Sequence, residues 1–412
     1  MTKHVAIVAG ESSYRTPDFL EAASLLRIAA HVVGDGVFPA GHEGLEVCLD
    51  DPTAAARTIA AELPHLDAVI GVDDHAVLAA AAAAALLGLP HNPADAVAAT
   101  RNKATLRQLL SAAGTAQPDF RTAPPGAVLP AAAELGYPVV VKPTSLAASR
   151  GVIRVNHPGQ AAVAENRIRS ILEAAGLPAT QSLLVERYIP GEEVAVEGLL
   201  GPDGLEVLAV IDKPDPLEGP FFEETLYVTP SRHDSTVQAN AVRLVETAAT
   251  AIGLQTGPVH AEIRIGANGD CYLIEIAARS IGGLCGRAFS FGLLGESLEV
   301  LILRAALGLA SPDSSPARPA TGVLMLPIPA TGTLTGVGGI EAARAVPGVD
   351  HVTITIATGR RVETLPEGDR YLGFVFAGGA DPVSVEQSLR MAGNELSVTI
   401  DGEEVRPPTP LA

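Results

Sequence analysis

Over residues 1–100, short apolar runs alternate with alanine-rich segments of helical character. The runs are β-branched and end at glycine or acidic positions, which is typical of buried strands. They lie at residues 4–9, 31–33, 45–49 and 66–72. The segments between them predict helices over about 17–30, 52–63 and 75–87. Regular alternation of strand and helix favours a small doubly wound α/β domain built on a parallel sheet.

A helix is predicted next, over about 101–113, and after a proline-rich connection and a short helix comes the run Tyr-Pro-Val-Val-Val-Lys-Pro. This run predicts a buried strand that carries one lysine, Lys142. A lysine among apolar residues is costly unless it meets an anion, so Lys142 either binds an anion or reaches solvent from the strand end. The loop 144–151, made mostly of small residues, follows it. Such a loop can lay its backbone N–H groups over phosphate oxygens.

Residues 183–198 predict a strand, a Pro-Gly turn and a second strand. A further strand is expected at 205–212, and a long helix with apolar residues at helical spacing is expected at about 234–252. Two alternating runs then flank the turn Gly-Ala-Asn-Gly-Asp, at residues 259–265 and 271–276. This pattern predicts a β-hairpin.

Each strand of that hairpin carries one acidic residue among apolar neighbours, Glu262 and Glu275. Counting outward from the turn can bring the two carboxylates to the same face, where they would repel each other. A divalent cation between them resolves the repulsion, and a ligand set made only of oxygen favours Mg²⁺. The alternative is that one carboxylate is the solvent face of an edge strand. Arg279 and a cluster of glycines follow closely and favour the binding site.

After a helix at about 295–308, the proline- and serine-rich stretch 312–319 predicts a linker. The rest of the chain predicts one helix at 382–394 and several strands, at 322–327, 351–356, 371–377 and 396–399. We therefore expect a small α+β domain over 320–404.

Composition narrows the class of protein. A chain of 412 residues is expected to form roughly two to four domains. Its net charge of −19 argues against a nucleic-acid partner and against an anionic membrane surface, so any phosphate must be held by local cations, backbone amides or metal. Three cysteines without a Cys-x-x-Cys pair, and a start that runs straight into a strand without a signal peptide, favour a cytoplasmic protein.

The motifs RNKATLR, PVVVKP, LVERYIPGEEV, HAEIRI and YLIEIAARSIGG follow one another in an order and spacing that resembles the ATP-grasp ligases. Within that superfamily, IEIAAR with its following glycine pair and the stretch FFEETLYVTPS resemble the L-amino-acid ligase (dipeptide synthase) branch of carboxylate–amine ligases. The resemblance covers residues 1–310, and more weakly 320–400. It implies a Rossmann-like N-terminal domain (1–100), a two-lobed ATP-grasp domain (101–310, with a lid at about 130–198) and the small C-terminal domain.

The resemblance also implies roles for individual residues. Lys103 and Lys142 would contact the ATP phosphates, and the loop containing Ser149 and Gly151 would close over them as a lid. Arg279 would face the transferred phosphoryl group. The adenine edge would be lined by Glu186, Arg187, Tyr188 and Ile189, and the ribose would be held by Glu193. The metal would be bound by Glu262 and Glu275. The substrates would be contacted by Glu224, Tyr227, Gly282 and Gly283.

This sequence departs from the family pattern at three places. Ala277 stands where many ATP-grasp enzymes have an asparagine that binds metal. The loop LAASRG holds less glycine than is usual for the lid. Tyr227 stands where some relatives of the branch have histidine, which puts a substrate role for it in doubt.

These features predict an enzyme that activates a small-molecule carboxylate as an acyl phosphate and couples it to an amine, using ATP with Mg²⁺, or Mn²⁺ in its place. The sequence leaves open whether the protein forms a homodimer, because no motif indicates one. The alternatives are another ATP-grasp activity, such as a biotin carboxylase or a purine-pathway ligase, and a non-catalytic nucleotide-binding protein. Retention of Lys142, both metal glutamates and Arg279 argues against the last of these.

Overall fold

In the computed structural model, which describes residues 2–11, 13–36, 38–39, 41–289, 294–310 and 318–405, the chain opens with a four-stranded sheet. All its strand pairs are parallel. Across the sheet the strands are β3 (Gly44–Glu46), β2 (Ala29–Gly34), β1 (His4–Val8) and β4 (Ala68–Gly71). The helices of this part are α1 (Thr16–Leu25), α2 (Pro52–Glu62), α3 (Val77–Leu86) and α4 (Ala94–Arg101). The predicted doubly wound α/β unit is therefore confirmed.

One helix prediction in this part of the chain was wrong in its end point, and one helix was not predicted. The helix expected over 17–30 ends at Leu25, because Arg27 takes a left-handed conformation with φ 56° and the chain turns into β2. The helix expected over about 101–113 is confirmed as α5 (Lys103–Ala112), and the sequence did not predict α4, which ends directly before it at Arg101. The Asn102 side chain accepts hydrogen bonds from the backbone N–H groups of Ala104 and Thr105, so it caps α5.

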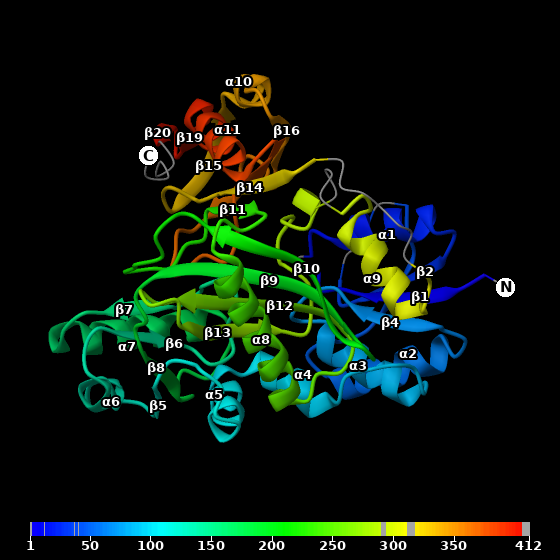
Figure 1. Ribbon diagram of the computed structural model, residues 1–412, viewed down its shortest axis with the longest axis horizontal. Coiled ribbons are helices and arrows are strands. Elements are labelled where there is room, and N and C mark those ends of the chain that lie inside the picture. The colour runs from blue at the N-terminus through cyan, green and yellow to red at the C-terminus, as the bar shows by residue number, and fades with distance from the viewer. Residues whose placement is uncertain are drawn as a thin grey trace.

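A second, antiparallel sheet forms a separate lobe, at the lower left in Figure 1. Its strands, in order across the sheet, are β5 (Phe120–Ala123), β8 (Leu183–Arg187), β6 (Val139–Lys142) and β7 (Ile153–Val155). Two helices pack on it and close its core, α6 (Val128–Leu135) and α7 (Pro158–Ala174). This lobe therefore includes β5 and ends at β8, whereas the sequence placed a lid at about 130–198.

The central sheet has eight strands and runs through the middle of the molecule (Figure 1). Its strands, in order across the sheet, are β13 (Cys271–Ala277), β12 (Gly257–Ile265), β9 (Glu192–Gly201), β10 (Gly204–Lys213), β11 (Leu226–Thr229), β14 (Ala320–Leu326), β18 (Gly373–Gly379) and β16 (Val349–Ile354). Helix α8 (Ser235–Ile252) packs against this sheet. The strand pair predicted at 183–198 is thus divided between two sheets, because β8 joins the lobe and β9 joins the central sheet.

The C-terminal part continues the central sheet instead of standing apart from it, since β14 pairs with β11. It adds a smaller sheet of β17 (Arg361–Val362), β15 (Gly332–Gly338), β19 (Ser397–Ile400) and β20 (Glu403–Val405). Its helices are α10 (Ile340–Ala345) and α11 (Pro382–Glu395). Most of the linker predicted at 312–319 lies outside the described residues.

A buried salt bridge joins the N-terminal unit to the central part. Arg15 donates to Glu299 at 2.7 Å and to the Ser280 hydroxyl at 2.6 Å, and Glu299 lies on α9 (Leu298–Leu307). In Figure 1, α9 lies beside α1, and the N-terminal unit sits on the right of the central sheet. Among the described residues, no helix combines the length and the apolar character that crossing a bilayer requires. All three cysteines are unpaired.

Candidate functional site

A cavity of about 840 Å³ opens where the N-terminal unit, the lobe, the central sheet and the C-terminal part meet. Every site residue predicted from the sequence lines it except Gly151. The cavity also takes in residues that the sequence did not single out, among them Asp74, Arg101, His260, Asp369 and Tyr371. Residues that are widely separated in the chain are therefore brought to one place.

The two hairpin carboxylates face each other across the strands. In the register of β12 and β13, Glu262 is the direct partner of Glu275, so both side chains leave the sheet on one face, as the sequence predicted. Their side chains are 22% and 27% exposed, so both carboxylates are largely removed from solvent even though β13 is the edge strand. Cations lie beside both, with Lys103 Nζ 3.3 Å from Glu275 and Lys213 Nζ 3.4 Å from Glu262.

His260 stands next to this pair. Its Nδ1 lies 3.0 Å from Glu197, and its Nε2 lies 3.7 Å from Glu262. Burial alone would lower the pKa of His260, but the hydrogen bonds and negative charge of the two glutamates raise that pKa to about 9. His260 is therefore a buried cation at neutral pH, opposite Ala277 in the strand register.

Lys142 ends strand β6, and its amine is buried against an anion instead of reaching solvent. Lys142 Nζ lies 2.7 Å from Glu186, whose other oxygen accepts from Arg107 at 2.6 Å. Burial would raise the pKa of Glu186, but Arg107 and Lys142 outweigh burial and hold that pKa below its usual range. Glu186 was assigned to the adenine edge by resemblance. In the structure, its carboxylate is committed to these two cations.

Lys213 is a functional candidate that the sequence reasoning missed. Its side chain is only 2% exposed, lies 2.7 Å from Glu193 and forms a very short contact with Glu224. Burial would lower the pKa of Lys213, but the surrounding carboxylates raise it well above the usual value. The signal was present, because Lys213 ends an apolar strand as Lys142 does. The same cost of burial that singled out Lys142 applies to it.

The residues assigned to ribose and to substrate are held by this lysine. Glu193 uses its second oxygen on Arg264, at 2.8 Å. Glu224 accepts a hydrogen bond of 2.6 Å from the Tyr227 hydroxyl. The carboxylates of Glu193 and Glu224 are therefore both engaged by protein groups before any ligand enters.

The segment between β8 and β9 lines the cavity with Arg187, Tyr188 and Ile189, as expected for an adenine edge. The Tyr188 amide donates to the Pro138 carbonyl at 3.1 Å, which ties this segment to the start of β6. The ring of Tyr188 lies under the guanidinium of Arg154, 4.1 Å from its centroid. Both of these contacts are with the lobe, so they fix Tyr188 to it.

The loop that follows β6 is docked on the C-terminal part. Ser149 lines the cavity, but the Gly151 amide donates to the Pro366 carbonyl at 2.9 Å. Arg150 donates to the Glu367 carbonyl at 2.9 Å, and Arg167 pairs with the Glu367 carboxylate through two bonds of 2.7 and 2.9 Å. The Gly151 amide is thus engaged away from the cavity.

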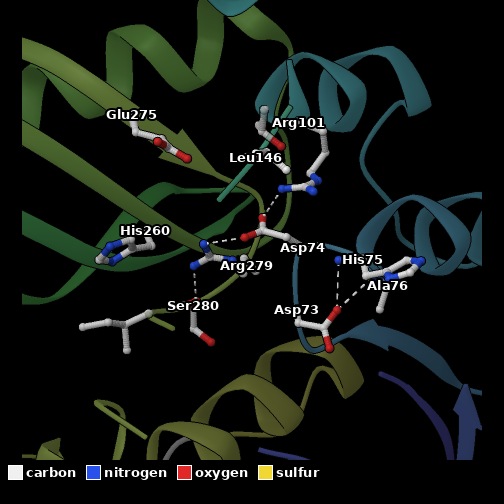
Figure 2. Close-up of polar contacts among 12 residues, drawn as sticks. Asp73, Asp74, His75, Ala76, Arg101, Leu146, His260, Glu275, Arg279 and Ser280 are labelled. Carbon is white, nitrogen blue, oxygen red and sulfur yellow. Dashed lines mark hydrogen bonds and ion pairs between the residues drawn. The ribbon is translucent and has the colours of Figure 1, made fainter. Parts of the chain in front are cut away.

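Arg279 follows β13 and reaches toward the N-terminal unit. Its Nη2 lies 2.7 Å from Asp74, and its Nη1 donates to the Ser280 carbonyl at 2.9 Å (Figure 2). The chain then passes Gly282 and Gly283, which both line the cavity. Gly283 has a φ of 59°, and a Cβ there would lie 3.0 Å from the Phe374 ring. A side chain at this position would be strained and crowded.

Two comparisons place these features among known proteins. Residues 135–288 match the family described as the ATP-grasp domain, and residues 324–401 match the L-amino acid ligase C-terminal domain 2. The chain is 29% identical over 197 residues to the alanine–anticapsin ligase of Bacillus subtilis (strain 168), a match that covers 44% of this chain. The matched segment spans only 39% of the length of that relative.

Among solved structures, the chain resembles the L-amino acid ligase from Bacillus licheniformis, with a TM-score of 0.80 and 25% identity over 97% of this chain and 99% of that one. A carboxyaminoimidazole ribonucleotide synthase from Aspergillus clavatus gives a TM-score of 0.75 at 19% identity, covering 96% of this chain and 98% of that one. The second likeness concerns the fold alone.

Glu223 supplies a prediction about stability and pH. The residue is half-buried, has no ion pair or hydrogen bond with the described part of the chain, and burial raises its pKa from 4.5 to about 7. Folding therefore favours its protonated form, so its contribution to stability is lost as the pH rises from 4.5 to about 7.

We expect Glu223→Gln to raise the free energy of unfolding by about 1–3 kcal/mol above pH 7 and to change little below pH 4.5. Urea denaturation across this pH range measures the difference. The exposed Glu218 supplies the matched control, Glu218→Gln, which should leave the pH profile unchanged. An equal gain at low pH would contradict the assignment to Glu223 ionisation.

The docked loop supplies a second prediction. Glu367→Gln removes the charge from a pair with Arg167 whose side chains are 42% and 38% exposed, so the loss is about 0.5–1 kcal/mol. We expect trypsin to cleave after Arg150 about two- to fivefold faster. The control is Glu134→Gln, because Glu134 pairs with Arg121 on the same lobe with side chains 51% and 62% exposed. Faster cleavage in both variants would point to general loosening of the lobe.

Proposed function

Because the chain carries an ATP-grasp domain followed by an L-amino acid ligase C-terminal domain, we propose that it is an ATP-dependent carboxylate–amine ligase acting on amino acids. It would activate the carboxylate of one amino acid as an acyl phosphate and couple it to the amine of a second, forming a dipeptide with release of ADP and phosphate. The observation that carries this proposal is the meeting of Lys103, Lys142, Arg279 and the Glu262–Glu275 pair around one cavity.

ATP would lie between the lobe and the central sheet. Lys103 and Lys142 would meet its phosphates, with Ser149 covering them from the loop. The base would lie along Arg187, Tyr188 and Ile189, which line the cavity in sequence. Glu193 would accept from the ribose hydroxyls, although Lys213 and Arg264 already hold its oxygens. Phosphoryl transfer needs positioning and charge neutralisation from the protein and little else.

Glu262 and Glu275 would hold a magnesium ion, since they are direct partners in the strand register and carry oxygen donors on one face of the sheet. Mn²⁺ would fit the same donors, and Ala277 offers none. When bound, the ion would neutralise charge on the phosphates of ATP. Without the ion, the positive charges of Lys103 and Lys213 beside these carboxylates reduce the repulsion between them.

The chemistry then follows from general principles. A carboxylate oxygen of the first substrate forms a bond to the γ-phosphorus, and the bond from that phosphorus to the ADP oxygen breaks. The amine nitrogen of the second substrate then bonds to the acyl carbon, and phosphate leaves with the acyl oxygen while the nitrogen loses a proton. Arg279 would stabilise the charge on the transferred group. Glu224, Tyr227, Gly282 and Gly283 would border the substrates.

The experiment that tests the proposal is incubation with ATP, Mg²⁺ and pools of amino acids, with phosphate release and product masses followed together. A new mass equal to two substrates minus water, formed with one phosphate per product, supports ligation. Phosphate release that needs bicarbonate would instead indicate carboxylase-like chemistry. Nucleotide binding without phosphate release from any pool would favour the non-catalytic alternative.

For Arg279 we expect the substitution Arg279→Ala to lower kcat by about 10²- to 10³-fold, equivalent to about 3–4 kcal/mol, with a small effect on the KM for ATP. The control is Arg287→Ala, because Arg287 pairs with Asp18 outside the cavity. Steady-state kinetics at saturating substrates give both constants. An unchanged kcat in Arg279→Ala would remove this residue from the mechanism.

A further inference from the structure

Two adjacent aspartates follow strand β4, and their side chains serve different purposes. Asp73 accepts hydrogen bonds from the backbone amides of Gly10, His75 and Ala76, so it caps the turn into α3. Asp74 makes none of these contacts. Its two oxygens lie 2.9 Å from Arg101 and 2.7 Å from Arg279, and Figure 2 shows it between the two guanidinium groups.

The side chains in this bridge are largely removed from solvent. Exposure is 19% for Asp74, 15% for Arg279 and 24% for Arg101. Burial would raise the pKa of Asp74, but Arg279 and then Arg101 outweigh burial and hold it well below the usual range. The bridge is therefore charged at every pH of interest, and charge-assisted hydrogen bonds of this kind are short and directional.

The bridge leaves much of Arg279 free for a ligand. A guanidinium has five N–H donors, and the two contacts of Arg279 go to Asp74 and to the Ser280 carbonyl. Arg279 also lines the cavity, so its other donors are open to an anion there. Arg101 ends α4, two residues before Lys103, so Asp74 links Arg279 to the start of the helix that carries a predicted phosphate contact.

Without Asp74, other carboxylates would attract Arg279. Glu275 and Glu197 both act on its charge in the folded protein, and Glu275 is one of the two proposed metal ligands. A guanidinium that turned to Glu275 would leave its place in the cavity and would compete for the metal. A fixed anion on the far side of Arg279 prevents that movement.

We propose that Asp74 is a positioning residue, which holds Arg279 and Arg101 so that Arg279 meets the transferred phosphoryl group and the acyl phosphate. This inference rests on the proposed function. It also gives the N-terminal unit an indirect part in the chemistry, because Asp74 acts through the two arginines that it holds. Asp74→Asn preserves the shape of the side chain, removes its charge and replaces one of the two acceptor oxygens with an NH2 donor, so the side chain can no longer hold both arginines.

We expect Asp74→Asn to lower kcat by about 10- to 100-fold while the KM for ATP changes less than about threefold. We also expect fewer amide bonds than phosphates released, because a displaced Arg279 would leave the acyl phosphate open to water. The control is Asp18→Asn, since Asp18 also joins the N-terminal unit to the central part, through Arg287. This control should keep both the rate and the ratio of amide to phosphate.

A second measurement does not depend on knowing the substrates. The thermal stabilisation given by ADP with Mg²⁺ is compared with that given by ADP, Mg²⁺ and aluminium fluoride, which mimics the transferred phosphoryl group. Wild type should gain further stabilisation from the fluoride, and Asp74→Asn should lose that gain while keeping the response to ADP. If no amide forms in any pool, the proposed function fails, but the fluoride comparison still decides the role of Asp74.

Three results would overturn the inference. One is a kcat and an amide-to-phosphate ratio in Asp74→Asn that match wild type. Another is loss of the response to ADP alone, which would mean that Asp74 supports the fold and does not position Arg279. The third is the absence of any fluoride gain in wild type, because Arg279 would then not meet the transferred group.

Discussion

Charged groups buried in a protein need partners, and this requirement shapes the whole cavity. Lys142, Lys213 and Arg279 are each within hydrogen-bonding distance of a carboxylate, supplied by Glu186, by Glu193 and by Asp74. An isolated buried ion would be far more costly than such a pair. Without ligand, the cavity is therefore held in shape by its own anions. A ligand with phosphate groups would meet cations that are already in place, because pairing with these carboxylates offsets the cost of burying their charge.

The pairs also explain why the separate parts of the fold act on one site. Asp74 comes from the N-terminal unit, Lys142 from the lobe and Glu275 from the central sheet, while the Glu367 carbonyl of the C-terminal part accepts a hydrogen bond from Arg150 in the loop after β6. Each carboxylate orients a cation that lies on another element. The geometry of the site therefore depends on how these elements are placed relative to one another. In Figure 1 the N-terminal unit, the lobe and the C-terminal part lie around the central sheet. Residues from all four parts line the cavity. Movement of one part would therefore alter the pairs made by the others.

The sequence predicted what depends on local pattern. The hairpin of β12 and β13 follows from alternation around a glycine-rich turn, and the cost of burying a lysine identified Lys142. Pairing between distant strands was not predictable, so β8 and β9 were not assigned to different sheets, and β14 was not joined to β11. Lys213 and Asn102 did carry local signals, at a strand end and at a helix cap. Asp74 carried none, because its importance comes from Arg101 and Arg279, which the fold brings to it.

Net charge and local charge act over different distances here. At −19, the chain as a whole repels a polyanion, and this repulsion accumulates along a long partner such as nucleic acid. In salt, however, the field of exposed charges fades over roughly 8–10 Å. The cavity is lined in part by buried cations such as Lys103 and Lys142, which water and salt screen less than exposed charges. A compact nucleotide therefore interacts mainly with the charges inside the cavity, whereas an extended polymer would interact mainly with the acidic surface. For this reason an acidic chain can still present a phosphate site.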